Sequence, residues 1–138
     1  MAHNRKLIRH AVKDLLIDNT SAGPNVYPNR ETNLWESELP AILIYTKDEP
    51  EAQPRAVNSQ QYIRKLTLFI EIKTLATETV DDDLDDLAEE VESIIRANPN
   101  LNSTATSVQY KGTEIILDAT SETEKGVAIL TFEVQYIH

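Results

Sequence analysis

Several residue types are scarce or absent in this 138-residue chain, and each absence excludes a class of protein. There is no cysteine, which excludes disulfide frameworks, zinc ribbons, iron–sulfur sites and thiol nucleophiles. The three glycines lie too far apart for the glycine-rich loops that bind nucleotide phosphates. No apolar run approaches the ~18 residues of a membrane span. We therefore expect no cofactor and no membrane insertion.

Histidine and positive charge are also scarce. His3, His10 and His138 show neither the two-histidine spacing of a metal site nor a partner set for a Ser-His-Asp triad. Acidic residues number 23 against 13 basic ones, and the net charge of -10 repels nucleic acid and anionic lipid. The first ten residues are charged where a signal peptide would be apolar, so we expect a cytoplasmic protein.

The residues that are present predict one domain over 1–138, with two helices. Apolar residues recur at helical spacing from Arg5 to Ile17, and again from Val80 until Pro99 ends the pattern. Thr79 or Asp81 is the expected N-cap of the second helix, whose first turn is acidic and suits the helix dipole.

The strand pattern predicts a largely antiparallel sheet. The expected strands are Ala41–Tyr45, Tyr62–Leu75, Val108–Leu117 and Val127–Ile137, with a short extended piece at 26–28. The last two form a hairpin in which Gly126 is expected to have a positive φ. Segment 46–60 contains two prolines and predicts a long mobile loop. The fold class is α+β, in the order αββαββ, with both helices packed on the sheet.

The two helices carry opposite charges. The outer face of the first helix is basic, whereas residues 78–92 hold nine acidic residues and no basic one. These faces are either solvated surfaces or patches that meet between neighbouring subunits. The carboxylates could attract a hard cation, but adjacent helical side chains diverge, which favours a solvated face over a metal site. Trp35 is either a lid on the core or an interface anchor.

A family resemblance rests on five segments of the chain. They are Val26-Tyr27-Pro28-x-Arg30, Ser37 to Thr46, Arg64-x-Leu66-x-Leu68-x-Ile70-Glu71-Ile72, Leu84 to Ile95, and Phe132 to Tyr136. Over about residues 7–137 the chain resembles phage tail terminators, the minor tail protein U family of long-tailed phages. The resemblance implies a six-membered ring that caps the tail tube and meets a head-completion or connector protein. It places the chain at the head–tail junction of the virion, after assembly in the host bacterial cytoplasm.

Such a role needs contact surfaces and no catalysis. The residues expected at a subunit or partner interface are Arg5, Arg9, Lys13, Trp35, Asp82, Asp85, Asp86 and Glu89. The residues of the loop expected to contact the tube are Lys47, Asp48, Glu49, Glu51 and Arg55. Six subunits at -10 each would give a ring of -60, so that DNA passes through the lumen without specific binding.

Three alternatives stay open from the sequence. One is another neck or tail-completion subunit. The second is an acidic interaction module, such as a protein that mimics DNA, which residues 78–92 suggest. The third is an enzyme that uses a divalent ion at Asp82, Asp85 or Glu89.

Overall fold

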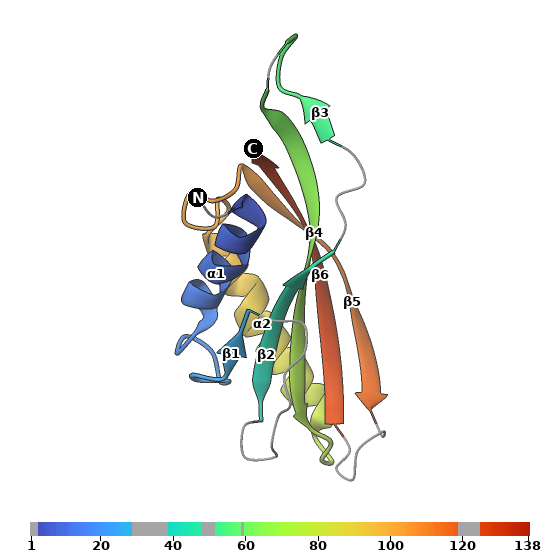
Figure 1. The fold of residues 1–138 in the computed structure, drawn as a ribbon. Helices are drawn as coiled ribbons and strands as arrows, with labels where there is room; N and C mark the ends of the chain where they lie inside the picture. Colours follow the sequence, from blue (N-terminus) through green and yellow to red (C-terminus); the bar gives the residue numbers. More distant parts are fainter. Residues whose placement is uncertain (1–2, 29–38, 48–51, 59, 119–124) are drawn as a thin grey trace.

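The protein forms one mixed sheet with two helices (Figure 1). The computed structural model describes residues 3–28, 39–47, 52–58, 60–118 and 125–138. Along the chain the elements are α1 (Asn4–Leu16), β1 (Val26–Tyr27), β2 (Ala41–Thr46), β3 (Ala52–Pro54), β4 (Tyr62–Leu75), α2 (Val80–Ala97), β5 (Ser107–Asp118) and β6 (Lys125–Ile137). The α+β prediction is confirmed; β1 lies in the extended piece expected at 26–28, and the structure adds the short strand β3 to the expected order.

The strand order in the sheet is β1-β2-β4-β6-β5, and β3 pairs with the beginning of β4. Among the strands of the described residues, the β1–β2 pair is parallel and the other pairs are antiparallel. Strand β3 lies inside the segment that was expected to be a loop, and its three residues pair with Tyr62, Ile63 and Arg64. The β1 and β5 ends of the sheet are therefore far apart in the strand order.

Both helices cover the same face of the sheet (Figure 1). Helix α1 packs on β1 and β2, α2 packs on β4 and β6, and the two helices touch each other. Their buried sides follow the helical repeat, with Ile8, Ala11, Val12 and Leu16 in α1 and Leu84, Leu87, Ala88, Val91 and Ile95 in α2. The contacts of the helices centre on β1, β2, β4 and β6, and β5, the last strand of the sheet, lies beside this region.

The core lies between the helices and the two central strands. Leu66, Leu68, Ile70 and Ile72 of β4 are fully buried, as are Ala128, Leu130 and Val134 of β6. The predicted alternation along both strands is confirmed, because each second side chain points toward the helices. Burying each Leu or Ile side chain stabilises the fold by about 1.5–3 kcal/mol.

The helix ends follow local chemistry. The backbone N–H of Arg5 donates to His3 Nδ1 at 3.1 Å, which caps α1. Thr79 precedes α2, as one of the two expected caps, and Asp81, Asp82 and Asp83 occupy the first turn. The helix ends at Ala97, before Pro99, as the sequence predicted.

The prediction of a positive φ at Gly126 is wrong. Gly126 lies within β6, opposite Thr74 of β4 and Leu117 of β5, and positive φ values occur instead at Gly23 and Gly112. A Cβ at residue 126 would collide with Val80 Cγ2 and lie 3.2 Å from Leu84 Cδ1. Gly126 is therefore needed because the first turn of α2 approaches the sheet closely there.

Candidate interaction surfaces

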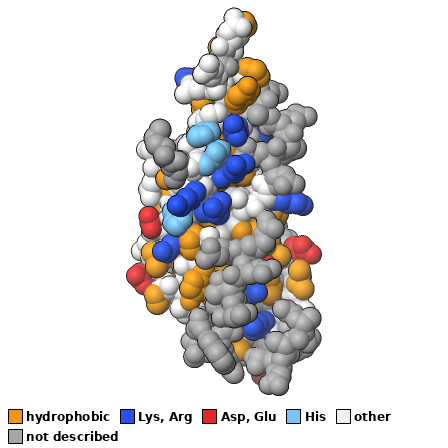
Figure 2. Space-filling view, viewed as in Figure 1, with side chains coloured by type: hydrophobic (Ala, Val, Ile, Leu, Met, Phe, Trp, Pro, Cys, Tyr) orange, Lys and Arg blue, Asp and Glu red, His pale blue; other side chains and the backbone are white. Residues whose placement is uncertain are grey.

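Helix α1 carries a basic surface, which we define as Arg5, Lys6, Arg9 and Lys13. Figure 2 shows blue Lys and Arg side chains and pale blue histidines gathered along this helix. Arg9 Nη1 donates to Thr46 Oγ1 of β2 at 3.3 Å, which places this side of α1 next to the second strand of the sheet. The basic surface thus belongs to the β1–β2 end of the molecule.

Six of the acidic residues of α2 form two rows. The inner row is Asp83, Asp86 and Glu90, spaced three and four residues apart on one side of the helix. Glu90 accepts hydrogen bonds from the backbone N–H of Ser21 at 2.8 Å and from Ser21 Oγ at 2.7 Å. Asp83 and Asp86 line a hollow that Ser21 also lines. The inner row therefore faces the turn between α1 and β1.

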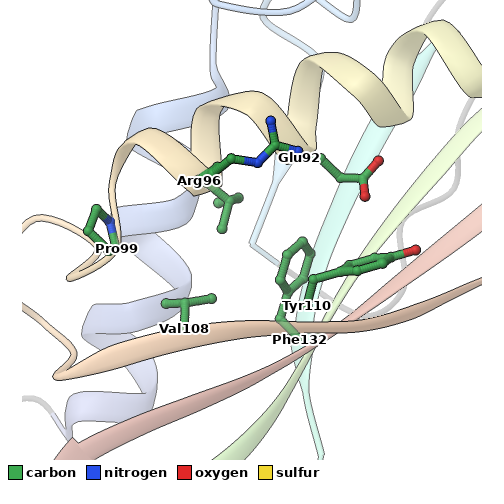
Figure 3. A pocket seen from close by; sticks show the side chains of 7 residues that line it. Glu92, Arg96, Pro99, Val108, Tyr110 and Phe132 are labelled. Atoms are coloured by element: carbon green, nitrogen blue, oxygen red, sulfur yellow. The ribbon is translucent and has the colours of Figure 1, made fainter.

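The outer row is Asp85, Glu89 and Glu92, on the side of α2 that faces β5. Glu92 and Arg96 line a cavity of about 330 Å³ together with Val108, Tyr110 and Phe132 of the hairpin. Figure 3 shows the Glu92 and Arg96 side chains on the helix above these hairpin residues. Asp85 and Glu89 are exposed and share the helix side of Glu92. Asp82 is also exposed, near the start of the helix.

Strand β5 exposes several large apolar side chains. Tyr110, Ile115 and Leu117 are 45%, 45% and 58% exposed. They lie opposite Phe132, Ala128 and Gly126 of β6, whose side of the sheet is the helix side. We call Tyr110, Ile115 and Leu117 the apolar strip. It lies on the helix side of the sheet, where Tyr110 borders the cavity beneath α2 and Ile115 and Leu117 lie outside the lining of that cavity.

A further surface is an arm, which we define as β3, the turn residues 55–58, 60 and 61, and the first four residues of β4. Figure 1 shows the arm extending beyond α1. Hydrogen bonds close its turn, since Arg55 donates from its backbone N–H to Gln61 O at 3.0 Å and from Nη1 to Gln61 Oε1 at 3.1 Å. Val57, in this turn, is 93% exposed. The arm therefore presents an apolar side chain to solvent.

The residues predicted for the interfaces are distributed over these surfaces. Arg5, Arg9 and Lys13 share the basic surface, whereas Asp85 and Glu89 lie in the outer row and Asp86 lies in the inner row. Lys47 is exposed directly after β2, and Arg55 lies in the turn of the arm. Trp35, Asp48, Glu49 and Glu51 lie outside the described residues.

Sequence reasoning missed the apolar strip. The run Ile115-Ile116-Leu117 is apolar and strand-like, which is the pattern of a buried strand as well as of an uncovered edge. The available indication was the position of the strand: β5 follows α2 in the chain and lies at the end of the sheet, beside β6. Among the described residues, no group of three or more His, Asp or Glu side chains could hold a metal ion. No helix in the described ranges is long and apolar enough to cross a membrane.

These observations define a structural protein whose charged, apolar and projecting surfaces suit contact with other proteins. The model of the phage minor tail protein U family matches residues 3–136, and the chain belongs to this family. It is therefore a tail terminator, a structural component of the virion that caps the tail tube, and not an enzyme. Family membership decides against the acidic interaction module and the divalent-ion enzyme. A search of curated proteins gave no significant match.

Proposed function

We propose that six copies of this chain close into a ring at the end of the tail tube. The observation that supports the ring is the difference between the surfaces at the two ends of the sheet. The basic surface lies at the β1–β2 end, whereas the outer row and the apolar strip lie at the β5 end. A contact between unlike surfaces repeats from head to tail, and such contacts form rings when the rotation closes. The number six is our proposal, taken from what the resemblance to the family implies.

The ring would end tail growth by offering the tube one complementary face and no site for a further tube ring. We assign the tube contact to the arm, with Arg55 and the exposed Val57 in its turn. The opposite face of the ring would receive the head-completion or connector protein. This arrangement puts the chain at the head–tail junction of the virion.

DNA would pass through the lumen of the ring without specific binding. The net charge of -10 per chain disfavours binding to phosphates. On the sheet face opposite the helices, Lys73 Nζ lies 3.4 Å from Glu71 Oε2, and Lys111 Nζ lies 4.0 Å from Glu133 Oε2. These carboxylates offset the positive charge that would otherwise attract DNA.

Native mass spectrometry tests the ring. Six copies of 15.6 kDa give a species of about 94 kDa, expected to grow with protein concentration or on addition of purified tail tubes. A chain that stays monomeric alone and binds tubes as a monomer would contradict the ring. Retention of labelled duplex DNA by the ring at physiological salt would contradict the proposed free passage.

The arm can be tested by complementation of a terminator-deficient phage. The substitution Val57→Asp places a charge on the exposed turn without touching the core. We expect tails longer than normal and few joined heads, counted by electron microscopy. The matched control is Asn102→Asp, which places the same charge on an exposed residue of the turn after α2, outside the proposed contact surfaces. Normal tails with the Val57→Asp variant would remove the arm from the tube contact.

A further inference from the structure

We propose that the β5 end of the chain is the surface on which the next copy docks, and that it receives the basic surface of that copy's α1. The receiving surface consists of the outer row on α2 and the apolar strip on β5. This inference rests on the proposed ring and names the two surfaces that meet at each of its contacts.

The first argument is the exposure of the apolar strip. Three large apolar side chains on one side of this 12-residue edge strand are about half exposed. A partner that covered them would remove apolar surface from water, which favours binding. Edge strands of this length invite pairing or covering by another chain. The cavity of about 330 Å³ beside Tyr110 gives the same region a concave shape. The strip is thus a surface suited to be covered.

The second argument is the match of charge and spacing. Arg5, Arg9 and Lys13 follow one another at four-residue steps along α1, and Asp85, Glu89 and Glu92 follow at steps of four and three along α2. At ~1.5 Å of rise per residue, the two rows are about 12 Å and about 10.5 Å long. Three cations can therefore lie along three carboxylates when two helices pack side by side. Charge complementarity of this kind fixes partner and register.

The third argument is that Arg and Lys suit the mixed chemistry of the receiving surface. Their aliphatic stems can cover Ile115 and Leu117 while the charged ends reach the outer row. A guanidinium can also lie over the exposed ring of Tyr110. A partner surface with only apolar side chains would leave the carboxylates of the outer row unpaired, and one with only small cationic groups would leave the apolar strip in water.

The fourth argument is placement. Helix α1 packs on β1 and β2, whereas the receiving surface is formed by α2 and the strand at the other end of the sheet. The two surfaces therefore meet between copies, in a head-to-tail contact. A two-fold contact formed by one of these ends alone would instead bring like charges together, basic on basic or acidic on acidic.

A charge-exchange experiment tests the inference. Variant A carries Asp85→Lys and Glu89→Lys, so that both contact surfaces are basic. Variant B carries Arg9→Glu and Lys13→Glu, so that both are acidic. We expect neither variant to form rings alone, because like charges meet, and we expect an equimolar mixture to form rings with alternating A and B. Circular dichroism verifies that each variant is folded, and native mass spectrometry reads the composition.

Chemical cross-linking gives a second readout, because the chain contains no cysteine. Lys13→Cys and a tagged Asp85→Cys, mixed and treated with a bismaleimide, should form a mixed dimer, while each single variant alone should not. The matched control is Lys65→Cys in place of Lys13→Cys. Lys65 is exposed on the sheet face opposite the helices and should give no mixed dimer.

The outcomes separate this inference from the proposed ring. Rings formed by variant A or B alone, or no mixed cross-link where wild-type rings are seen, would overturn the contact and leave the ring intact. Cross-linking of either single variant with itself would indicate a two-fold contact and would also overturn it. If the mixed cross-link forms but native mass spectrometry detects only open assemblies and no closed species of six copies, the contact is retained and the ring is contradicted.

Discussion

Strands β4 and β5 flank the same strand, β6, yet their side chains have opposite environments. Strand β4 has neighbours on both sides and α2 above it, and its Leu68 and Ile70 are fully buried. Strand β5 pairs only with β6, and its Ile115 and Leu117 are about half exposed on the same face of the sheet. The apolar residues of β4 therefore stabilise the fold, whereas those of β5 are available to a partner.

The largest expected effect comes from truncating one side chain in each strand. Leu68→Ala should lower the free energy of unfolding by about 2–5 kcal/mol, because it removes fully buried methyl groups and leaves a cavity. Leu117→Ala should change it by less than about 0.5 kcal/mol. Urea denaturation of the monomer measures both. Equal losses would show that the side chains of β5 contribute to the core as much as those of β4.

Gly126→Ala tests how closely α2 approaches the sheet. The added methyl group would collide with Val80, and we expect a loss of about 1–3 kcal/mol in unfolding free energy from overpacking. The control is the double variant with Val80→Ala, which vacates the space and should recover part of the loss. If the single variant is as stable as the wild type in urea denaturation, the spacing between α2 and β6 is not limiting.

The two acidic rows of α2 should differ more modestly. Glu90→Ala removes the acceptor of both hydrogen bonds from Ser21, and we expect a loss of about 1 kcal/mol, given their exposure to solvent. Asp85→Ala, in the outer row, should change stability by less than about 0.5 kcal/mol. Thermal unfolding compares the two at equal salt. A larger loss for Asp85→Ala would assign the outer row a role in the fold.

The smallest effect is expected on the sheet face opposite the helices. Lys111 and Glu133 approach to 4.0 Å with side chains that are about 40% exposed. Lys111→Ala should therefore cost no more than about 0.5 kcal/mol, and added salt should reduce the difference from wild type. Urea midpoints at low and high salt measure it. A salt-independent loss above 1 kcal/mol would assign Lys111 a packing role.

Much of the fold could be predicted because most elements are buried on one side only. The alternation in β4 and β6 and the helical stripes of α1 and α2 are direct consequences of that burial. Strand β5 shows why the interaction surface could not be predicted. Its apolar run would look the same under a helix, and whether α2 covers it depends on where the helix crosses the sheet.

Short elements and packing contacts carried too little pattern to predict. Strand β3 has three residues, fewer than a period-2 pattern needs to be recognised, whereas the two residues of β1 were expected as part of an extended piece at 26–28. Gly126 resembled a turn glycine because it precedes an apolar strand, but its role is to make room for Val80. The capping bond from Arg5 to His3 was equally hidden, because histidine is not among the usual N-cap residues.

The length of β4 has a mechanical consequence. Its 14 residues span about 45 Å at ~3.3 Å each, and pairing with β6 continues from Ile63 to Leu75. Hydrogen bonds between antiparallel strands are perpendicular to the strand direction. A pull on the arm along β4 would therefore load many bonds in shear at once, rather than opening them one by one. Strand β4 would therefore transmit tension from the arm into the sheet without separating from β6.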